Sequence, residues 1–255
     1  MAIWVIGDLH LAFSVPDKTM EVFGKQWEAY SEKIKRHWEH LITPDDLVLI
    51  PGDISWASHL EDALIDLRWI DALPGKKLLL KGNHDHWWSS KKKLKEKLPP
   101  SLFCLQQDTF TWNDVAIGGA RLWDTVEYAF DLIPSQHDLP TLTEEERHQQ
   151  EKIYDRELGR LERSLSQLDP SARYRIAMTH YPPLGLDLKP SRATTLFEAY
   201  QVDISVFGHL HHLPANSSLF GEKNGIHYLL TAADYINFKP IQLVDTSGQL
   251  VCTKK

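Results

Sequence analysis

The chain contains little cysteine: only Cys104 and Cys252 occur among 255 residues, and neither belongs to a C-x-x-C pair. This scarcity argues against a disulfide framework and against a zinc site built from thiolates. The chain also lacks any apolar run long enough to span a bilayer. Its first residues, MAIWVIGDLH, lack the basic segment of a secretory signal. We therefore expect a cytoplasmic protein without a transmembrane segment.

An excess of positive charge is absent as well. Lys and Arg number 28 against 35 for Asp and Glu, which gives a net charge of −7. This balance disfavours nucleic acid as a partner without excluding it, because the basic run KKKLKEK at 91–97 forms either a solvated helix face or a phosphate contact.

The length fits one large domain, so we expect a single domain over 1–255. No feature of the sequence indicates an oligomeric state.

Three short apolar runs in the first half of the chain stop abruptly at glycine and polar residues. They lie at 3–6, 47–50 and 78–80, and are followed by Asp8 and His10, by Asp53, and by Asn83 and His84. Segments that we expect to be helical separate or follow these runs. They lie over 17–41, from a capping box at Ser58 to about 72, and over 90–97. The alternation of strands and helices predicts a mostly parallel sheet.

The second half of the chain predicts more strands and a further helix. Strand candidates at 102–105, 109–112 and 115–118 suggest hairpins that continue the sheet. The following segment has no clear periodicity until Thr143 and Glu146 form a capping box that opens a long helix to about 168. We interpret 123–150 as an insertion that could cover a site as a lid. Two later strands, at 175–178 and 203–207, end near histidines.

Polar side chains therefore follow five separate strands, and in α/β sheets such carboxyl ends form ligand sites. Asp8 and His10 are two residues apart, so in extended backbone they point to the same side. The mixed nitrogen and oxygen donors suit Mn, Fe, Zn or Co and suit calcium poorly. Seven candidate ligands exceed the needs of one tetrahedral ion and fit two ions that share a carboxylate. They are Asp8, His10, Asp53, Asn83, His180, His209 and His211.

Charge indicates what such a centre would do. Two divalent ions exceed the charge of the two aspartates, so the site would attract an anion and acidify a shared water to hydroxide at neutral pH. A hydroxide fixed beside a bound anion fits in-line attack on phosphorus. His84, next to the proposed ligand Asn83, could give a proton to the leaving group as a catalytic acid, and Asp85 could orient it.

The motifs resemble those of the calcineurin-like metallophosphoesterases. GDLH at 7–10, GD at 52–53, GNHD at 82–85, the histidine of THYPP at 179–183 and GHLH at 208–211 follow the order of that family. The resemblance implies an α/β fold with a four-layer α-β-β-α sandwich of two mixed sheets. It also implies two metal positions that share Asp53: one with Asp8, His10 and His211, and the other with Asn83, His180 and His209. His84 falls on the family's general acid.

The second motif departs from the protein-phosphatase branch of that family, which carries GDxxDRG. This chain reads GDISWAS, with tryptophan at 56 and alanine at 57. The departure argues against a Ser/Thr protein phosphatase, and the chain is more similar to a bacterial branch. We expect a hydrolase of a small phosphorylated substrate (a phosphomonoester, phosphodiester or pyrophosphate) using two divalent or trivalent ions, with manganese favoured over iron or zinc. The alternative is an inactive metal-binding scaffold of the same fold.

Two further residues allow both a functional and a structural interpretation. Trp87 follows the third motif and would either stack on a substrate or pack the loop onto the core. Arg121 follows the strand candidate at 115–118 and would either bind a phosphate oxygen or form a surface salt bridge.

Overall fold

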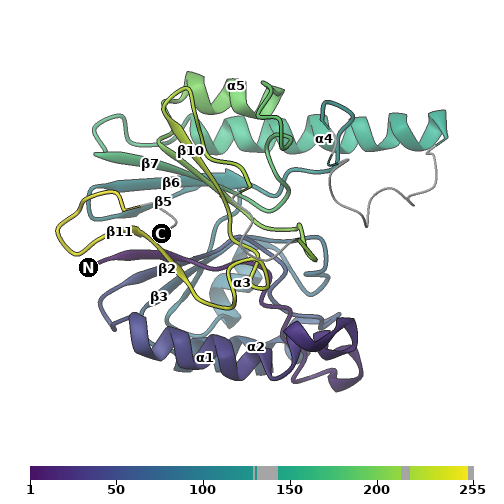
Figure 1. Ribbon diagram of the computed structural model, residues 1–255, viewed down its shortest axis with the longest axis vertical. Coiled ribbons are helices and arrows are strands. Elements are labelled where there is room, and N and C mark those ends of the chain that lie inside the picture. The colour runs from purple at the N-terminus through teal and green to yellow at the C-terminus, as the bar shows by residue number, and fades with distance from the viewer. Residues whose placement is uncertain (129, 131–142, 214–218, 252–255) are drawn as a thin grey trace. The chain divides into compact units, whose positions relative to one another are not determined.

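The computed structural model describes residues 1–128, 130, 143–213 and 219–251. Contacts divide the chain into two compact units, one made of Met1–Leu105 with Thr231–Lys255 and the other of Gln106–Leu230. Figure 1 shows the elements of each unit in colours that follow the chain. The expectation of a single domain stays a prediction. Most of the expected lid falls outside the described residues, which omit 129 and 131–142.

The first unit is built on a five-stranded sheet in the order β11-β1-β2-β3-β4. Strands β1 to β4 pair in parallel, and β11 is antiparallel to β1. The strands span Ile3–Val5 (β1), Leu47–Ile50 (β2), Lys76–Leu79 (β3), Leu102–Cys104 (β4) and Ile241–Val244 (β11). The three apolar runs seen in the sequence are thus neighbours in one sheet, and their carboxyl ends lie at the same edge.

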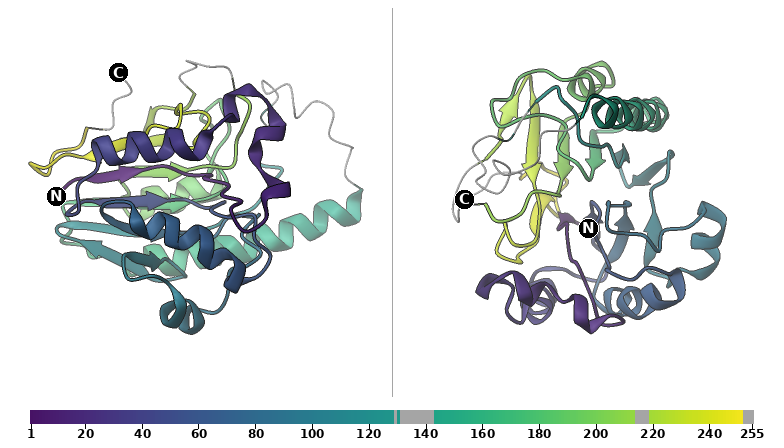
Figure 2. Two further views of the ribbon diagram at one scale, coloured as in Figure 1. Left: turned by 90° about the horizontal axis from the view of Figure 1, so that it is seen from below. Right: turned by 90° about the vertical axis from the view of Figure 1, so that its right-hand side faces the viewer.

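Helices α1 (Tyr30–Leu41) and α2 (Leu60–Ala72) pack against this sheet, and α3 (Lys91–Lys97) follows β3. Figure 2 shows α1 and α2 running alongside the strands. Alternate residues of β1 and β2, such as Trp4 and Val48, belong to one buried cluster with the inward face of both helices. The helices therefore form because their apolar stripes cover one face of the sheet.

Two expected helix starts are wrong. The segment expected as one helix over 17–41 is helical only from Tyr30, and three short 3₁₀ turns (η1 Pro16–Lys18, η2 Met20–Phe23, η3 Lys25–Trp27) precede it. Gly24, with φ of 126°, interrupts these turns because an α-helix does not accommodate that angle. The residue that caps α2 is His59 in place of Ser58, and it makes no side-chain capping bond.

The second unit contains a six-stranded sheet in the order β5-β6-β7-β8-β10-β9. Strands β6, β7, β8 and β10 are parallel, while β5 and β9 are antiparallel to their neighbours. The strands span Thr109–Trp112 (β5), Val115–Ala120 (β6), Tyr174–Thr179 (β7), Ile204–Phe207 (β8), Glu222–Lys223 (β9) and Ile226–Leu230 (β10). Only β5 and β6 form an expected hairpin. A hairpin of β4 with β5 is wrong, because β4 pairs in parallel with β3 in the other sheet.

Helices α4 (Glu144–Leu165) and α5 (Arg192–Ala199) complete the second unit, and α4 lies along β6 (Figures 1 and 2). The capping box of Thr143 and Glu146 at the start of α4 is confirmed. Ser164 of α4 accepts a hydrogen bond of 2.8 Å from the N–H of Gly119. Within the described residues, no helix has both the length and the apolar character needed to cross a membrane. Two mixed sheets with helices, as the resemblance implies, are confirmed.

Two glycines of the second unit should respond oppositely to alanine. A β-carbon at Gly119 would lie 1.8 Å from the carbonyl oxygen of Met178 in the paired strand β7, whereas one at Gly159 in α4 meets nothing within 4 Å. Chemical denaturation should show that Gly119→Ala destabilises the fold by at least about 2 kcal/mol because backbone must move. Gly159→Ala should stabilise it by about 0.5–1 kcal/mol. Equal stability of the two variants would contradict the pairing of β6 with β7.

Candidate metal centre

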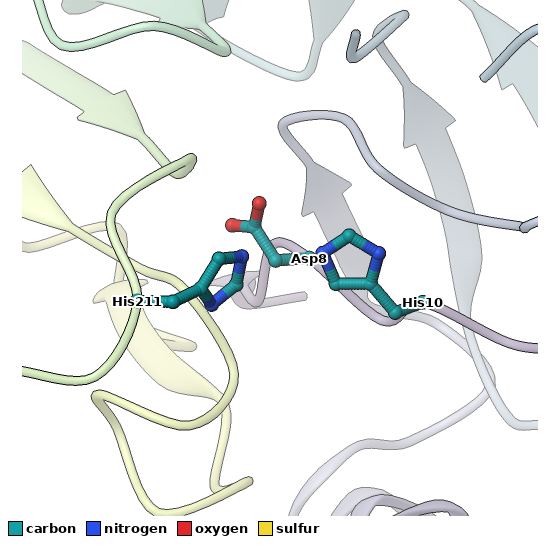
Figure 3. A group of neighbouring side chains, drawn as sticks. All are labelled: Asp8, His10 and His211. Carbon is teal, nitrogen blue, oxygen red and sulfur yellow. The ribbon is translucent and has the colours of Figure 1, made fainter. Parts of the chain in front are cut away.

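The loops after β1 and β2 continue the parallel pairing of their strands. The N–H groups of Asp8 and His10 donate to the carbonyls of Gly52 and Asp53 over 3.0 and 2.9 Å. Asp8, His10 and Asp53 are at most 2% exposed. Figure 3 shows the Asp8 and His10 side chains on the loop that follows β1. The two motifs GDLH and GD are therefore held side by side by main-chain hydrogen bonds.

The backbone at these residues has an unusual conformation. Asp8, His10 and Asp53 have φ angles of 54°, 44° and 50°, in the left-handed region that costs free energy for residues other than glycine. Neighbouring groups stabilise it: the hydroxyl of Tyr30, at the start of α1, donates to the carbonyl of His10 over 2.7 Å. Left-handed residues held in this way concentrate at binding and catalytic sites.

The loop after β3 is fixed by the carboxylate of Asp85. Its oxygens accept hydrogen bonds from four N–H groups: those of Gly82 at 2.8 Å, Ile54 at 2.9 Å and Ser55 at 3.2 Å, and the indole of Trp87 at 2.9 Å. Within the described part of the chain these are its hydrogen bonds, and none goes to the side chain of His84. Asp85 therefore ties the loop after β3 to the loop after β2.

Opposing effects act on the pKa of Asp85. Complete burial, and then the negative charge of Asp53, raise the pKa of its carboxyl. The backbone N–H groups of Gly82, Ser55 and Ile54 lower the pKa. A cation beside Asp53 would offset the repulsion between the two carboxylates, so a bound metal favours the ionised form that these donors require.

Asp53 lies at the centre of the first unit's share of the site. Its Oδ1 accepts the N–H of His84 over 2.8 Å, while its Oδ2 lies 3.7 Å from Nε2 of His10 and 4.0 Å from Nε2 of His84. Gly82 permits this arrangement, because a β-carbon there would lie 2.1 Å from Oδ1 of Asp53. The glycine of the third motif is therefore required by the close approach of the carboxylate.

The donors of the first unit fit a metal ion. Asp8 offers a carboxylate oxygen within 4.8 Å of a ligand atom of His10, and one within 4.8 Å of a carboxylate oxygen of Asp53. Two buried carboxylates at this distance repel each other, and a divalent cation beside them would remove that repulsion. Oxygen and imidazole donors without sulfur match the preferences of manganese, iron and zinc. Asn83 lies in the loop after β3, half-buried next to His84.

The second unit places three more candidate ligands on two adjacent loops. His180 follows β7 and is fully buried; His209 and His211 follow β8 and are half-buried (Figure 3 shows His211). The N–H of Gly208 donates to the carbonyl of His180 over 3.1 Å, and the rings of His180 and His209 are 5.2 Å apart. His209 also has a left-handed φ, of 73°. Parallel pairing of β7 with β8 therefore brings the last two motifs together.

Both residues proposed to contact substrate have partners within the chain, and their substrate contacts stay predictions. Trp87 is 2% exposed and belongs to the buried cluster of the first unit. Arg121 forms an ion pair of 3.4 Å with the buried Glu157 and lies over the ring of Trp123. That ion pair is internal and not on the surface, as its partner is 2% exposed.

Three residues near the candidate ligands were not identified from the sequence. Trp56 stacks on His10; the ring of Tyr181 lies 4.1 Å from that of His209; and an oxygen of Asp124 lies 4.0 Å from Nε2 of His209. Trp56 and Tyr181 follow motif residues closely, and Asp124 follows the end of β6. Their positions just after strand ends were the available signal.

Comparisons with known proteins identify a family and similar folds. The family model described as calcineurin-like phosphoesterase matches residues 1–213. The phosphopantetheinyl hydrolase PptH from Mycobacterium tuberculosis has a similar structure, with a TM-score of 0.55, 16% identity, and coverage of 96% of this chain and 97% of that one. The protein AQ665 from Aquifex aeolicus gives a TM-score of 0.48 at 18% identity, over 94% of this chain and 95% of that one.

A curated relative matches only in part. The Gene 66 protein of Mycobacterium phage L5 is 33% identical over 84 residues, which cover 32% of this chain and 39% of the phage protein. The family match is far longer, and on that match the chain belongs to the calcineurin-like phosphoesterase family. Membership supports a metal-dependent hydrolase of phosphoesters.

Alanine at Gly82 should weaken metal binding. The added β-carbon would displace the carboxylate of Asp53, so we expect the affinity for Mn²⁺, measured by titration calorimetry, to fall by about 10–100-fold. Gly159→Ala, which adds the same carbon in open space, should leave the affinity unchanged. If Gly82→Ala binds Mn²⁺ with wild-type affinity, metal binding does not depend on the close approach of the Asp53 carboxylate to residue 82.

Asparagine at Asp85 should destabilise the first unit. The substitution keeps one acceptor oxygen for four N–H donors and adds an NH₂ group that cannot accept from them. We expect a loss of about 2–4 kcal/mol in the free energy of unfolding, measured by urea denaturation. Asp45→Asn, on an exposed residue, should change it by less than about 0.5 kcal/mol. Equal effects of the two variants would contradict the role of Asp85.

Proposed function

We propose that this protein is a metal-dependent phosphoesterase with a dinuclear centre. The seven candidate ligands identified from the sequence would hold its two ions. The observation that supports this most is the set around Asp53, whose carboxylate faces both His10 and His84 and whose neighbours have left-handed backbone. The assignment of His180, His209 and His211 to the same pair of ions rests on the family motifs and on the ligand count. Asp53 is the proposed bridge between the two positions.

When bound, two divalent or trivalent ions, with manganese favoured, supply an acidified water and the positive charge that holds a phosphate group. Asp8 and Asp53 contribute the negative charges, and the histidines and Asn83 contribute neutral donors. This leaves a net positive site for an anionic substrate. The burial of Asp8, His10 and Asp53 strengthens their electrostatic interactions by excluding water.

His84 is the proposed proton donor. Hydrolysis adds water across the bond between phosphorus and the leaving oxygen, and that oxygen needs a proton as the bond breaks. The side chain of His84 is 37% exposed, and its Nε2 lies 4.0 Å from Oδ2 of Asp53. An exposed imidazole beside a buried candidate ligand is placed to meet both substrate and solvent. Its proton passes to the leaving oxygen and is replaced from water.

The substrate is proposed as a phosphomonoester, a phosphodiester or a pyrophosphate. The mycobacterial structure is named as a phosphopantetheinyl hydrolase, so a phosphopantetheinyl ester belongs among the substrates to be screened. The screen would also include nucleotides, dinucleoside polyphosphates, sugar phosphates and phospholipid head groups. The low sequence identity gives none of these substrates precedence.

Asparagine at Asp53 should abolish activity. Wild-type protein with Mn²⁺ should hydrolyse p-nitrophenyl phosphate or bis(p-nitrophenyl) phosphate and lose this activity on chelation. Asp53→Asn removes the carboxylate charge, and we expect turnover to fall by about 100-fold or more. Asp45→Asn is the matched control and should keep full activity. Binding of Mn²⁺ by wild type without turnover of any substrate would instead support the inactive scaffold.

A further inference from the structure

Trp56 contacts both a proposed metal ligand and the proposed proton donor. Its ring stacks on that of His10, with centroids 5.0 Å apart and planes at 24°. The ring of His84 is closer, at 4.3 Å with planes at 48°. His10 and His84 are themselves 5.7 Å apart, so the three rings contact one another. This aromatic triangle consists of residues from all three loops of the first unit's share of the site.

The backbone holds Trp56 firmly in this position. Its N–H donates to the carbonyl of Leu11 over 2.9 Å, and Ser55 forms a parallel bridge with Leu11. The hydroxyl of Ser55 accepts the N–H of Ala57 over 3.1 Å. The half-buried indole also packs against the buried cluster of the first unit. The loops after β1 and β2 thus fix the tryptophan, which can in turn fix its neighbours.

The indole Nε1 of Trp56 makes no hydrogen bond within the described residues that would account for a tryptophan at this position. This nitrogen is also buried. A buried N–H without a partner is unfavourable, so the contribution of this residue comes from its ring surface. Phenylalanine offers a similar surface without the N–H and should replace it in any role that depends on ring contact.

We infer that Trp56 is a positioning residue that holds the ring of His84 beside Asp53. This inference rests on the proposed function of His84. An imidazole that is 37% exposed has room to rotate, and an aromatic face at 4.3 Å restricts it. The same face attracts a protonated imidazole, because the ring carries negative charge density on its faces. Trp56 therefore fixes His84 without adding a charge next to Asp53.

The first test uses the metal-free protein and does not depend on activity. The ring current of Trp56 should shift the Hε1 resonance of His84 upfield, as followed by ¹³C-edited NMR with His84→Gln to assign the signal. Trp56→Ala should remove this shift and move the signal towards that of an unrestrained histidine, as the imidazole samples several rotamers. Trp56→Phe should retain a single narrow resonance with part of the shift. An unchanged His84 signal in Trp56→Ala would overturn the inference.

The second test compares two esters of the class that wild type hydrolyses with Mn²⁺, one with a p-nitrophenol leaving group and one with an aliphatic alcohol. A misplaced proton donor matters most for the alcohol, which leaves poorly as an anion. Trp56→Ala should lower kcat for the alkyl ester by about 10–100-fold and for the p-nitrophenyl ester by only a few-fold. Trp56→Phe should recover most of the loss.

Trp69→Ala is the matched control, because Trp69 is also half-buried against the same cluster, but its ring contacts that of Phe13, with centroids 5.5 Å apart and planes at 47°. It should lower stability without changing the ratio of the two esters. A Trp56→Ala variant that loses both activities equally would show a structural role only. If wild type itself has no metal-dependent turnover, the proposed function fails, while the NMR result still decides whether Trp56 orders His84.

Discussion

The candidate site depends on one buried carboxylate that is not among its proposed metal ligands. Asp85 accepts N–H groups from the loop that carries it and from the loop after β2, and so holds the second and third motifs in a fixed relation. The bond from the N–H of His84 to Oδ1 of Asp53 adds a further link between these two loops. The carboxylate of Asp85 also accepts the indole of Trp87, which belongs to the hydrophobic cluster behind the loops. The site is thereby connected to the core.

Links between the loops also stabilise the left-handed backbone of the proposed ligands. Left-handed conformations at Asp8, His10 and Asp53 each cost free energy, and they persist only where surrounding bonds hold them. The main-chain bonds between the first two loops and the hydroxyl of Tyr30 do this. Gly82 then lets the third loop approach the carboxylate of Asp53 more closely than any side chain would permit. Ligand geometry here follows from backbone constraints, before any ion is considered.

The sequence was informative where function depends on short local patterns. Apolar runs followed by glycine and polar residues located the strand ends, and parallel pairing then places Asp8, Asp53 and Asn83 at one edge of a sheet. The pattern could not show that Asp85 would serve backbone N–H groups, because its partners Ile54 and Ser55 lie about thirty residues away. Nor could helical spacing reveal that the turns before Tyr30 are 3₁₀.

Trp87 and Arg121 illustrate the same limit. Each follows a strand end, where the sequence alone leaves both a binding role and a packing role open. Burial of the tryptophan and the ion pair of the arginine with Glu157 are tertiary properties, which depend on residues far along the chain. Conversely, Trp56 appeared in the sequence only as the absence of an aspartate. In the structure its ring contacts the imidazoles of both His10 and His84.

The replacement of a carboxylate by an aromatic ring has an electrostatic consequence. An aspartate at position 56 would add a negative charge near Asp53, and would reduce the positive potential available to an anionic substrate. A tryptophan restrains His84 through contact alone and leaves that potential intact. The tryptophan also restricts the space around the imidazole of His84, since the centroids of the two rings are 4.3 Å apart. A site of this kind would bind its phosphate through the ions and the proposed proton donor.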